Sequence, residues 1–230
     1  MEHPLLINVE ARRYSPIELA RIYQCRRQVS HRFVSLPECI KVKCEAVGAP
    51  ALAHAIHLNL SDEYGLDPST GLDNGLGTHA QWVQDFLAAL SAVEPADIPL
   101  LSPEVAERLE IYAVDPNLSL STLTGMLMAA EKCVPIECKI FLEAFQLAYP
   151  FFADSSNQHC LLYFFEHIDH DEKRHLPVLI DGFLGDAPGT KSHVLSDQQA
   201  SGLNFEELFA GLDLMLGRYR RFYSSMEDLL

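Results

Sequence analysis

Three residues able to bind a metal recur at four-residue intervals in the segment FFEHIDHDEKRHLP, residues 164–177. They are His167, Asp171 and His175. Residues four apart in an α-helix lie about 40° apart around its axis, so these side chains can point inward together. The flanking residues are apolar, and buried titratable groups are costly unless they are paired or bound to a metal. The segment predicts either a metal-binding helix face or a charged surface turn.

A single carboxylate, Glu131, stands in the otherwise apolar stretch TGMLMAAEKCVP. A buried carboxylate needs a partner, so Glu131 is a second candidate ligand. Pro135 has no N–H to bond the carbonyl of Glu131, and we expect the helix to kink there and open space for a site. The alternative is that Glu131 pairs with Lys132 or reaches the surface.

Two further candidates, Glu63 and His79, flank the loop-forming segment LDPSTGLDNGLG, residues 66–77. Each alone would be read as a surface group at a helix end. Mixed imidazole and carboxylate ligands suit iron or manganese better than a structural zinc. Six ligands exceed the need of one ion that must still bind O₂, so two ions fit better. The complete candidate set is Glu63, His79, Glu131, His167, Asp171 and His175.

The elements that must position these residues are predicted to be helices. Helix N-caps are expected at Ser15, Thr78, Ser102, Ser119 and Asn204, each followed by a helix-forming run. The predicted helices cover residues 16–34, 38–47, 51–65, 79–90, 102–114, 119–149, 158–184 and 205–226. With the second and third taken as one interrupted helix, this predicts about seven helices in an all-α bundle, a single domain over residues 1–230.

Composition limits the classes of partner. The 230 residues carry a formal charge of −15, which disfavours binding to nucleic acid or anionic membranes. No apolar run approaches membrane-spanning length, and the N-terminus lacks a signal pattern, so we expect a soluble cytoplasmic protein. The six cysteines form no C-x-x-C motif, and we expect reduced, mostly buried thiols.

On these motifs the sequence resembles the haem-oxygenase-like diiron oxidase and oxygenase family. The family motifs are N-x-x-D/E-E-x-G, a histidine that opens the next helix, E-x-x-V/I-P, and a helix with His-x₃-Asp-x₂-His. Here they read NLSDEYG, THAQWVQDFLAAL, AAEKCVPIE and EHIDHDEKRH, over about residues 15–225. The resemblance implies a seven-helix haem-oxygenase-like fold without haem, in which the six candidate residues bind two irons.

The chain departs from the family pattern in two places. The interval between Glu63 and His79 is longer than usual, which predicts an enlarged loop. Three residues separate Asp171 from His175, one more than the common pattern. One extra residue is what a π-bulge adds, so we predict a bulge that returns His175 to the inward face. Without a bulge, His170 would be the alternative last ligand.

The resemblance implies a non-haem diiron enzyme that uses two Fe(II) ions and O₂ to oxidise a small substrate. Family members cleave or rearrange C–C and C–N bonds and give alkenes, nitriles or N-oxygenated products. We expect an amino acid or similar small carboxylate as substrate, with Arg174 and Lys132 as candidates to bind it. The resemblance also allows an external reductant and a homodimer.

Three alternatives remain from the residues. A ferritin-like diiron bundle needs two Glu-x-x-His pairs, and the chain offers only Glu172 with His175. A thiaminase-type hydrolase of the same fold would use a cysteine without metal, and Cys133 lies next to the Glu131 motif. A non-catalytic interaction protein would keep the bundle alone, although the intact set of six ligands argues against it.

Overall fold

The computed structural model of the chain is an all-α bundle, which confirms the predicted fold class. It describes residues 3–30, 32–95, 101–185 and 203–227, without the side chains of residues 170–172. The described helices are α1 (Pro4–Glu10), α2 (Pro16–Gln28), α3 (Ser35–Val47), α4 (Pro50–Glu63), α5 (His79–Val93), α6 (Pro103–Leu109), α7 (Leu120–Ala148), α8 (Pro150–Ala153), the 3₁₀ helix η1 (Ser155–Leu161), α9 (Leu162–Glu166), the π-helix η2 (His167–His175), α10 (Leu176–Phe183) and α11 (Phe205–Glu227).

Capping side chains start the helices where the sequence predicts. Ser15 and Glu18 form a reciprocal capping box at α2, and Pro16 follows at the first helical position. The hydroxyls of Thr78 and Ser119 accept from the backbone N–H three residues on, at the starts of α5 and α7. At α11, the Asn204 side chain accepts from the backbone N–H groups of residues 206 and 207. These helix starts are therefore fixed by local hydrogen bonds.

Helix boundaries near Pro37 differ from the prediction. The first predicted helix was expected to continue to residue 34, but α2 ends at Gln28. A new helix, α3, begins at Ser35, and Pro37 lies in its first turn. A residue in the first turn of a helix has no intrahelical partner for its N–H. Pro37, which lacks an N–H, is therefore compatible with the start of α3. The short helix α1 was not predicted, and α6 ends at Leu109, earlier than expected.

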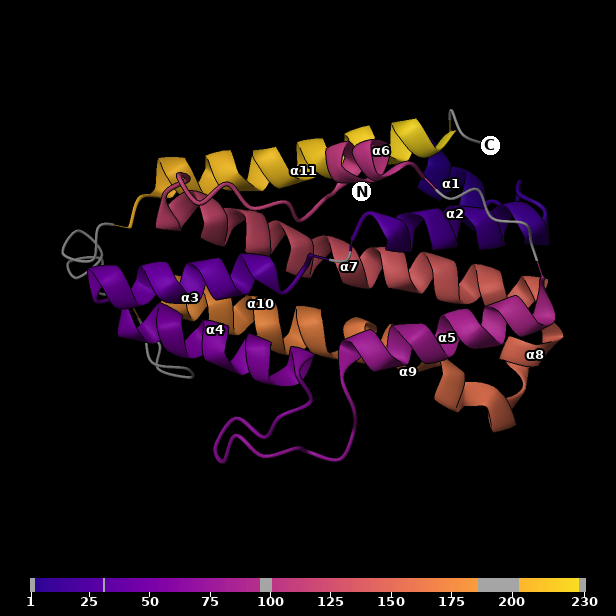
Figure 1. Cartoon of the computed structure of the whole chain (residues 1–230), viewed down its shortest axis with the longest axis horizontal. Coiled ribbons are helices and arrows are strands. Elements are labelled where there is room, and N and C mark those ends of the chain that lie inside the picture. Colours follow the sequence, from indigo (N-terminus) through magenta and orange to yellow (C-terminus); the bar gives the residue numbers. More distant parts are fainter. Residues whose placement is uncertain (1–2, 31, 96–100, 186–202, 228–230) are drawn as a thin grey trace.

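The longest helix, α7, crosses the length of the bundle with α11 beside it, and both helices start at the same end (Figure 1). Two glycines let their backbones approach closely. A Cβ added at Gly125 of α7 would lie 2.0 Å from the carbonyl oxygen of Leu208, and one added at Gly211 would lie 2.0 Å from that of Thr122. This contact between backbones fixes the position of α7 in the bundle.

An aromatic cluster fills the interior beside α7. Tyr23 of α2 contacts the rings of Phe86, Phe141, Phe145 and Phe164, with centroids 5.2–5.5 Å apart. These edge-to-face and tilted contacts join α2, α5, α7 and α9 in one core. All six cysteines are free and five are buried, as predicted. The core therefore holds α2 and α9 firmly against the middle of α7.

The predicted helix over residues 158–184 is instead a series of helical segments with different hydrogen-bonding patterns. The 3₁₀ helix η1 is followed by α9, and residues 167–175 form the π-helix η2 before α10 resumes. The irregularity predicted from the extra residue is thus confirmed, and it extends over nine residues. The wider π-turn changes which residues of this segment face the core.

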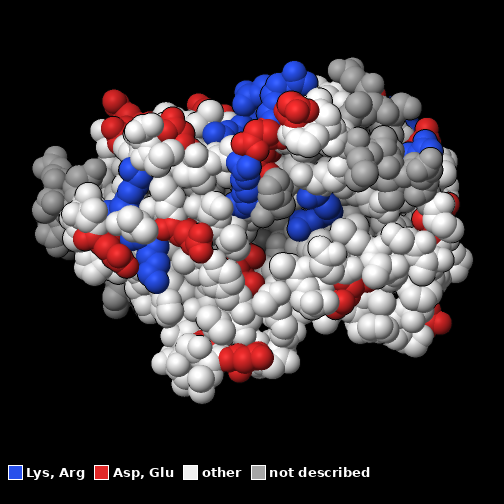
Figure 2. Space-filling view, in the orientation of Figure 1, with Lys and Arg blue, Asp and Glu red and all other residues white. Residues whose placement is uncertain are grey.

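Charged side chains of both signs share the surface. On the face in Figure 2, lysines and arginines are separated by acidic and uncharged residues and do not form one continuous basic band. Within the described ranges, the structure contains no helix with the length and apolarity needed to cross a membrane.

Gly211→Ala should lower the free energy of unfolding by at least about 2 kcal/mol, because its Cβ would push the α7 and α11 backbones apart. Gly217→Ala, on the same helix, is the matched control. Its Cβ would meet only the tip of Arg221 at 3.6 Å, so we expect stability to stay equal or rise by about 0.5–1 kcal/mol. Urea unfolding measures both. Equal stabilities for the two variants would contradict the close contact.

Candidate metal centre

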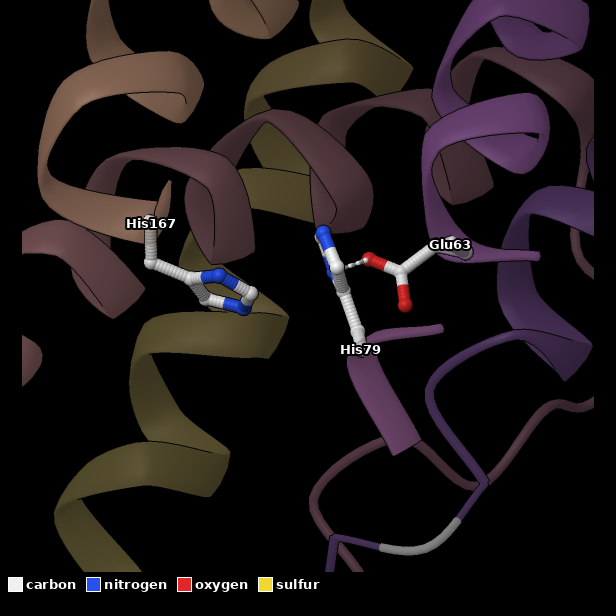
Figure 3. A group of neighbouring side chains, drawn as sticks. All are labelled: Glu63, His79 and His167. Carbon is white, nitrogen blue, oxygen red and sulfur yellow. Dashed lines mark hydrogen bonds and ion pairs between the residues drawn. The ribbon is translucent and has the colours of Figure 1, made fainter. Parts of the chain in front are cut away.

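Three of the predicted ligands meet in the middle of the bundle. Ligand atoms of Glu63, His79 and His167 all lie within 4.8 Å of one another, near enough for one cation to bind all three after small side-chain adjustments. Nδ1 of His79 is 2.8 Å from Oε1 of Glu63, and the His79 and His167 ring centroids are 4.7 Å apart (Figure 3). Both histidines are buried, so the surface position that His79 would have alone is excluded.

The loop between Glu63 and His79 has its two ends in contact, and this brings the two side chains together. Glu63 ends α4 and His79 begins α5, with the loop between them projecting from the bundle (Figure 1). Gly65 has a φ of +65°, and a Cβ there would lie 2.5 Å from the carbonyl oxygen of Gly77. Only glycine allows both the backbone conformation and this approach. The two ends of the loop therefore touch, which sets the distance between the two ligands.

His167 enters from the other side, at the junction of α9 and η2. Burial, and then the proximity of His79 and His175, hold the pKa of His167 well below its ordinary value, so the ring is neutral and can donate a lone pair. Its Nδ1 atom is buried and has no hydrogen-bond partner among the described side chains. A buried, neutral imidazole with an unused nitrogen beside a carboxylate is suited to a metal ion. The residues therefore fit the implied metal.

A second pair of predicted ligands lies beside this cluster. Glu131 of α7 is only 2% exposed, and its Oε2 is 3.3 Å from Nδ1 of His175. Asn59 donates from Nδ2 to Oε1 of Glu131 at 2.8 Å. The burial of Glu131 excludes the alternative in which it reaches the surface. The helix α7 continues through Pro135, and a kink there remains a prediction.

Asp62 holds the other side of the His175 ring, with its Oδ2 2.8 Å from Nε2. Burial alone would raise the pKa of Asp62, but the hydrogen bond and charge of His175, with Arg174, outweigh it and lower this pKa. Asp62 is the acceptor for Nε2–H of His175. In the neutral ring that a metal ligand requires, this hydrogen bond keeps the proton on Nε2 and leaves the lone pair of Nδ1 on the side of Glu131. Metal-binding histidines commonly donate their second ring N–H to a carboxylate in this way.

The sequence reasoning missed Asp62 and Asn59. Together with Glu63 they occupy positions i, i+3 and i+4 of α4, which is one helix face, and this spacing was the available signal. His175 is buried and faces Glu131, as the predicted bulge requires. The backbone of Asp171 lies in η2, but its side chain, and that of His170, lie outside the described residues. Asp171 remains a predicted ligand.

A cavity of about 140 Å³ adjoins the cluster. Its walls include four candidate ligands, Glu63, His79, Glu131 and His167, together with residues of α2 and the following turn. Its lining residues are Arg26, Arg27, Ser30, Phe33, Val34, Glu63, His79, Ala80, Tyr112, Ala130, Glu131, Val134, Tyr163 and His167. Arg174 and Lys132, the candidates for binding a carboxylate, are both exposed and are not part of this wall.

The fold is shared with a solved structure, that of a CADD-like protein of unknown function from Nostoc punctiforme. The TM-score is 0.67 at 14% sequence identity, and the alignment covers 96% of this chain and 86% of that chain. This similarity shows a common fold. No protein-family model matches the chain, and no curated protein matches it by sequence.

Gly65→Ala should weaken Fe(II) binding about tenfold or more, because its Cβ would separate the loop ends and with them Glu63 and His79. Gly71→Ala is the matched control, since Gly71 has a similar φ of +68° but open space around its Cβ position. Both variants carry the strain of a positive φ, and only the first displaces the ligands. Anaerobic Fe(II) titration measures the affinity. Equal affinities would show that the loop ends do not position the site.

Proposed function

We propose that this chain is a non-haem diiron enzyme of the haem-oxygenase-like diiron family. In this proposal it uses two Fe(II) ions and O₂ to oxidise an amino acid or similar small carboxylate, with cleavage or rearrangement of a C–C or C–N bond. The observation that carries the proposal is the cluster of Glu63 with the buried His79 and His167 on the wall of a small cavity. The all-α fold shared with the CADD-like structure is consistent with it.

The contacts suggest how the ligands divide. Glu63, His79 and His167 would hold one ion. Glu131 and His175, whose ligand atoms are 3.3 Å apart, would hold the other together with Asp171. Carboxylates offset the positive charge of the ions, and neutral imidazoles complete the donor set without adding charge. Bound iron supplies O₂ activation and electron transfer at this position.

The residues around the ligands have separate tasks in this proposal. Asp62 orients His175 through its Nε2 proton, and Asn59 donates to Glu131 and keeps one carboxylate oxygen in place. The Tyr163 ring lies 4.3 Å from that of His167 and restricts its movement. Apolar side chains of Val34, Val134 and Phe33 wall the cavity and limit the access of water to a reacting group.

The hydrolase alternative is not favoured by the surroundings of Cys133. Burial, and then the charge of Glu137, raise the pKa of this thiol to about 11. A nucleophilic cysteine needs the thiolate form, which is scarce at neutral pH under these conditions. Cys133 is also not among the residues that line the cavity.

Anaerobic Fe(II) loading followed by exposure to O₂ tests the proposal. We expect binding of two Fe(II) per chain, a transient visible absorption band, and O₂ uptake that increases with the correct carboxylate substrate. His167→Ala should lower iron binding and abolish O₂ uptake, because it removes a buried ligand. His54→Ala is the control, since His54 is exposed on α4 and should leave both unchanged.

Two results would overturn the proposal. A folded protein that binds no Fe(II) would favour the interaction protein. Turnover that needs no iron but is lost in Cys133→Ala would favour the hydrolase. Circular dichroism of each variant confirms that the comparison is made between folded proteins.

A further inference from the structure

Unused hydrogen-bond donors lie in the cavity wall formed by α2 and the turn after it. Arg26 and Ser30 are each 3% exposed, and both line the cavity that contains the metal cluster. Among the described residues, Nη1 of Arg26 and the hydroxyl of Ser30 have no hydrogen-bond partner. Buried donors are almost always satisfied in folded proteins, so two unsatisfied donors in one cavity wall point to a ligand.

The rest of the Arg26 guanidinium is held rigidly. Its Nε and Nη2 donate to the two oxygens of Glu137 at 2.7 and 3.0 Å, a bidentate pair in the core. Nη2 also donates to the hydroxyl of Tyr112 at 3.3 Å. Burial disfavours the charge of Arg26, but Glu137 outweighs it and keeps the pKa above its ordinary value. Nη1 is therefore a fixed, charged donor with both of its protons available.

Arg27 adds positive charge to the same wall. It is partly buried, its Nη1 donates to the hydroxyl of Tyr163 at 3.2 Å, and its guanidinium lies over the Tyr163 ring. Its Nε is buried and has no hydrogen-bond partner in the part of the chain that the structure describes. Arg26 and Arg27 are the cationic side chains among the lining residues, and the lining carboxylates Glu63 and Glu131 belong to the candidate metal centre. The two arginines therefore offer an anionic ligand its donors in this cavity.

We propose that Arg26 and Ser30, with Arg27 beside them, form the subsite that binds the carboxylate of the substrate. This inference rests on the proposed function and names the residues that select the substrate class. A carboxylate has two acceptor oxygens for the protons of Nη1 and of the Ser30 hydroxyl. A compact molecule anchored there shares the cavity with Glu63, His79 and His167.

The size of the cavity limits the ligand further. A cavity of about 150 Å³ is known to hold benzene, so the present volume suits a small ring or a short aliphatic chain with its carboxylate. It is too small for a nucleotide or a long acyl chain. The lining of Phe33, Val34 and Val134 favours an apolar body on the carboxylate.

Calorimetry with two matched pairs of probes, benzoate against benzamide and butyrate against butyramide, tests the subsite. Each is titrated into the full chain both metal-free and loaded with redox-inert Zn(II). We expect each carboxylate to bind at least about tenfold more tightly than its uncharged amide, in the metal-free protein as well. If the preference for carboxylates persists in the metal-free protein, it comes from the arginines and not from a bound cation.

Substitutions test which side chains bind the carboxylate. Arg26→Lys should raise the carboxylate Kd about tenfold, because lysine cannot pair with Glu137 and also present a fixed donor. Ser30→Ala should raise it several-fold and removes only a hydroxyl, so it remains informative if Arg26→Lys does not fold. Arg32→Lys is the control, since Arg32 is exposed and pairs with Glu107. It should bind the carboxylates like the unaltered chain.

Three outcomes would overturn the subsite. They are equal affinity for carboxylates and amides, unchanged carboxylate affinity in folded Ser30→Ala, and no binding of either carboxylate. The result is separable from the proposed function. Selective carboxylate binding without Fe(II)-dependent O₂ uptake would sustain the subsite and end the oxidase proposal, and the reverse result would end the subsite alone.

Discussion

Two buried carboxylates on one helix impose the main constraint on this structure. Glu131 and Glu137 lie on α7 in the interior of the bundle, exposed by only 2% and 3%. Burying an unpaired charge costs on the order of several kcal/mol, so each carboxylate needs polar partners from other helices. Glu131 is met by Asn59 and His175, and Glu137 by Arg26. The first set of partners belongs to the candidate metal centre, and Arg26 belongs to the proposed substrate subsite.

Irregular backbone places the remaining ligands around α7. The π-helix carries His167 and His175 on a segment where a regular α-helix would rotate later residues away from the core. π-Helical segments are rare and are frequently found at functional sites. Here the contacts of His175 with Glu131 and Asp62 offset the cost of the irregular backbone. The least regular helix of the described chain thus supplies two of the predicted ligands.

The sequence predicts features that depend on local chemistry. The helix starts at Ser15, Thr78 and Ser119 follow from hydrogen bonds within a few residues. The extra residue before His175 predicts a local bulge, which the structure shows as a longer π-helix. It could not predict features that depend on packing between distant segments. The contact of Asp62 with His175 spans 113 residues, and that of Arg26 with Glu137 spans 111. For this reason Arg174 and Lys132, near the motifs in sequence, were chosen over Arg26.

Because Gly65 and Gly77 are in contact, the relative position of Glu63 and His79 does not depend on the length of the loop between them. Once the two ends meet, residues added or lost between them extend or shorten a projection into solvent without moving Glu63 or His79. Chain-closure entropy rises only slowly with length, so such changes are inexpensive for folding. The number of residues between two ligands can therefore change while their positions in the site stay the same. A sequence motif that fixes the number of residues between the glutamate and the histidine would miss chains of this kind. A motif that includes the two glycines would detect them.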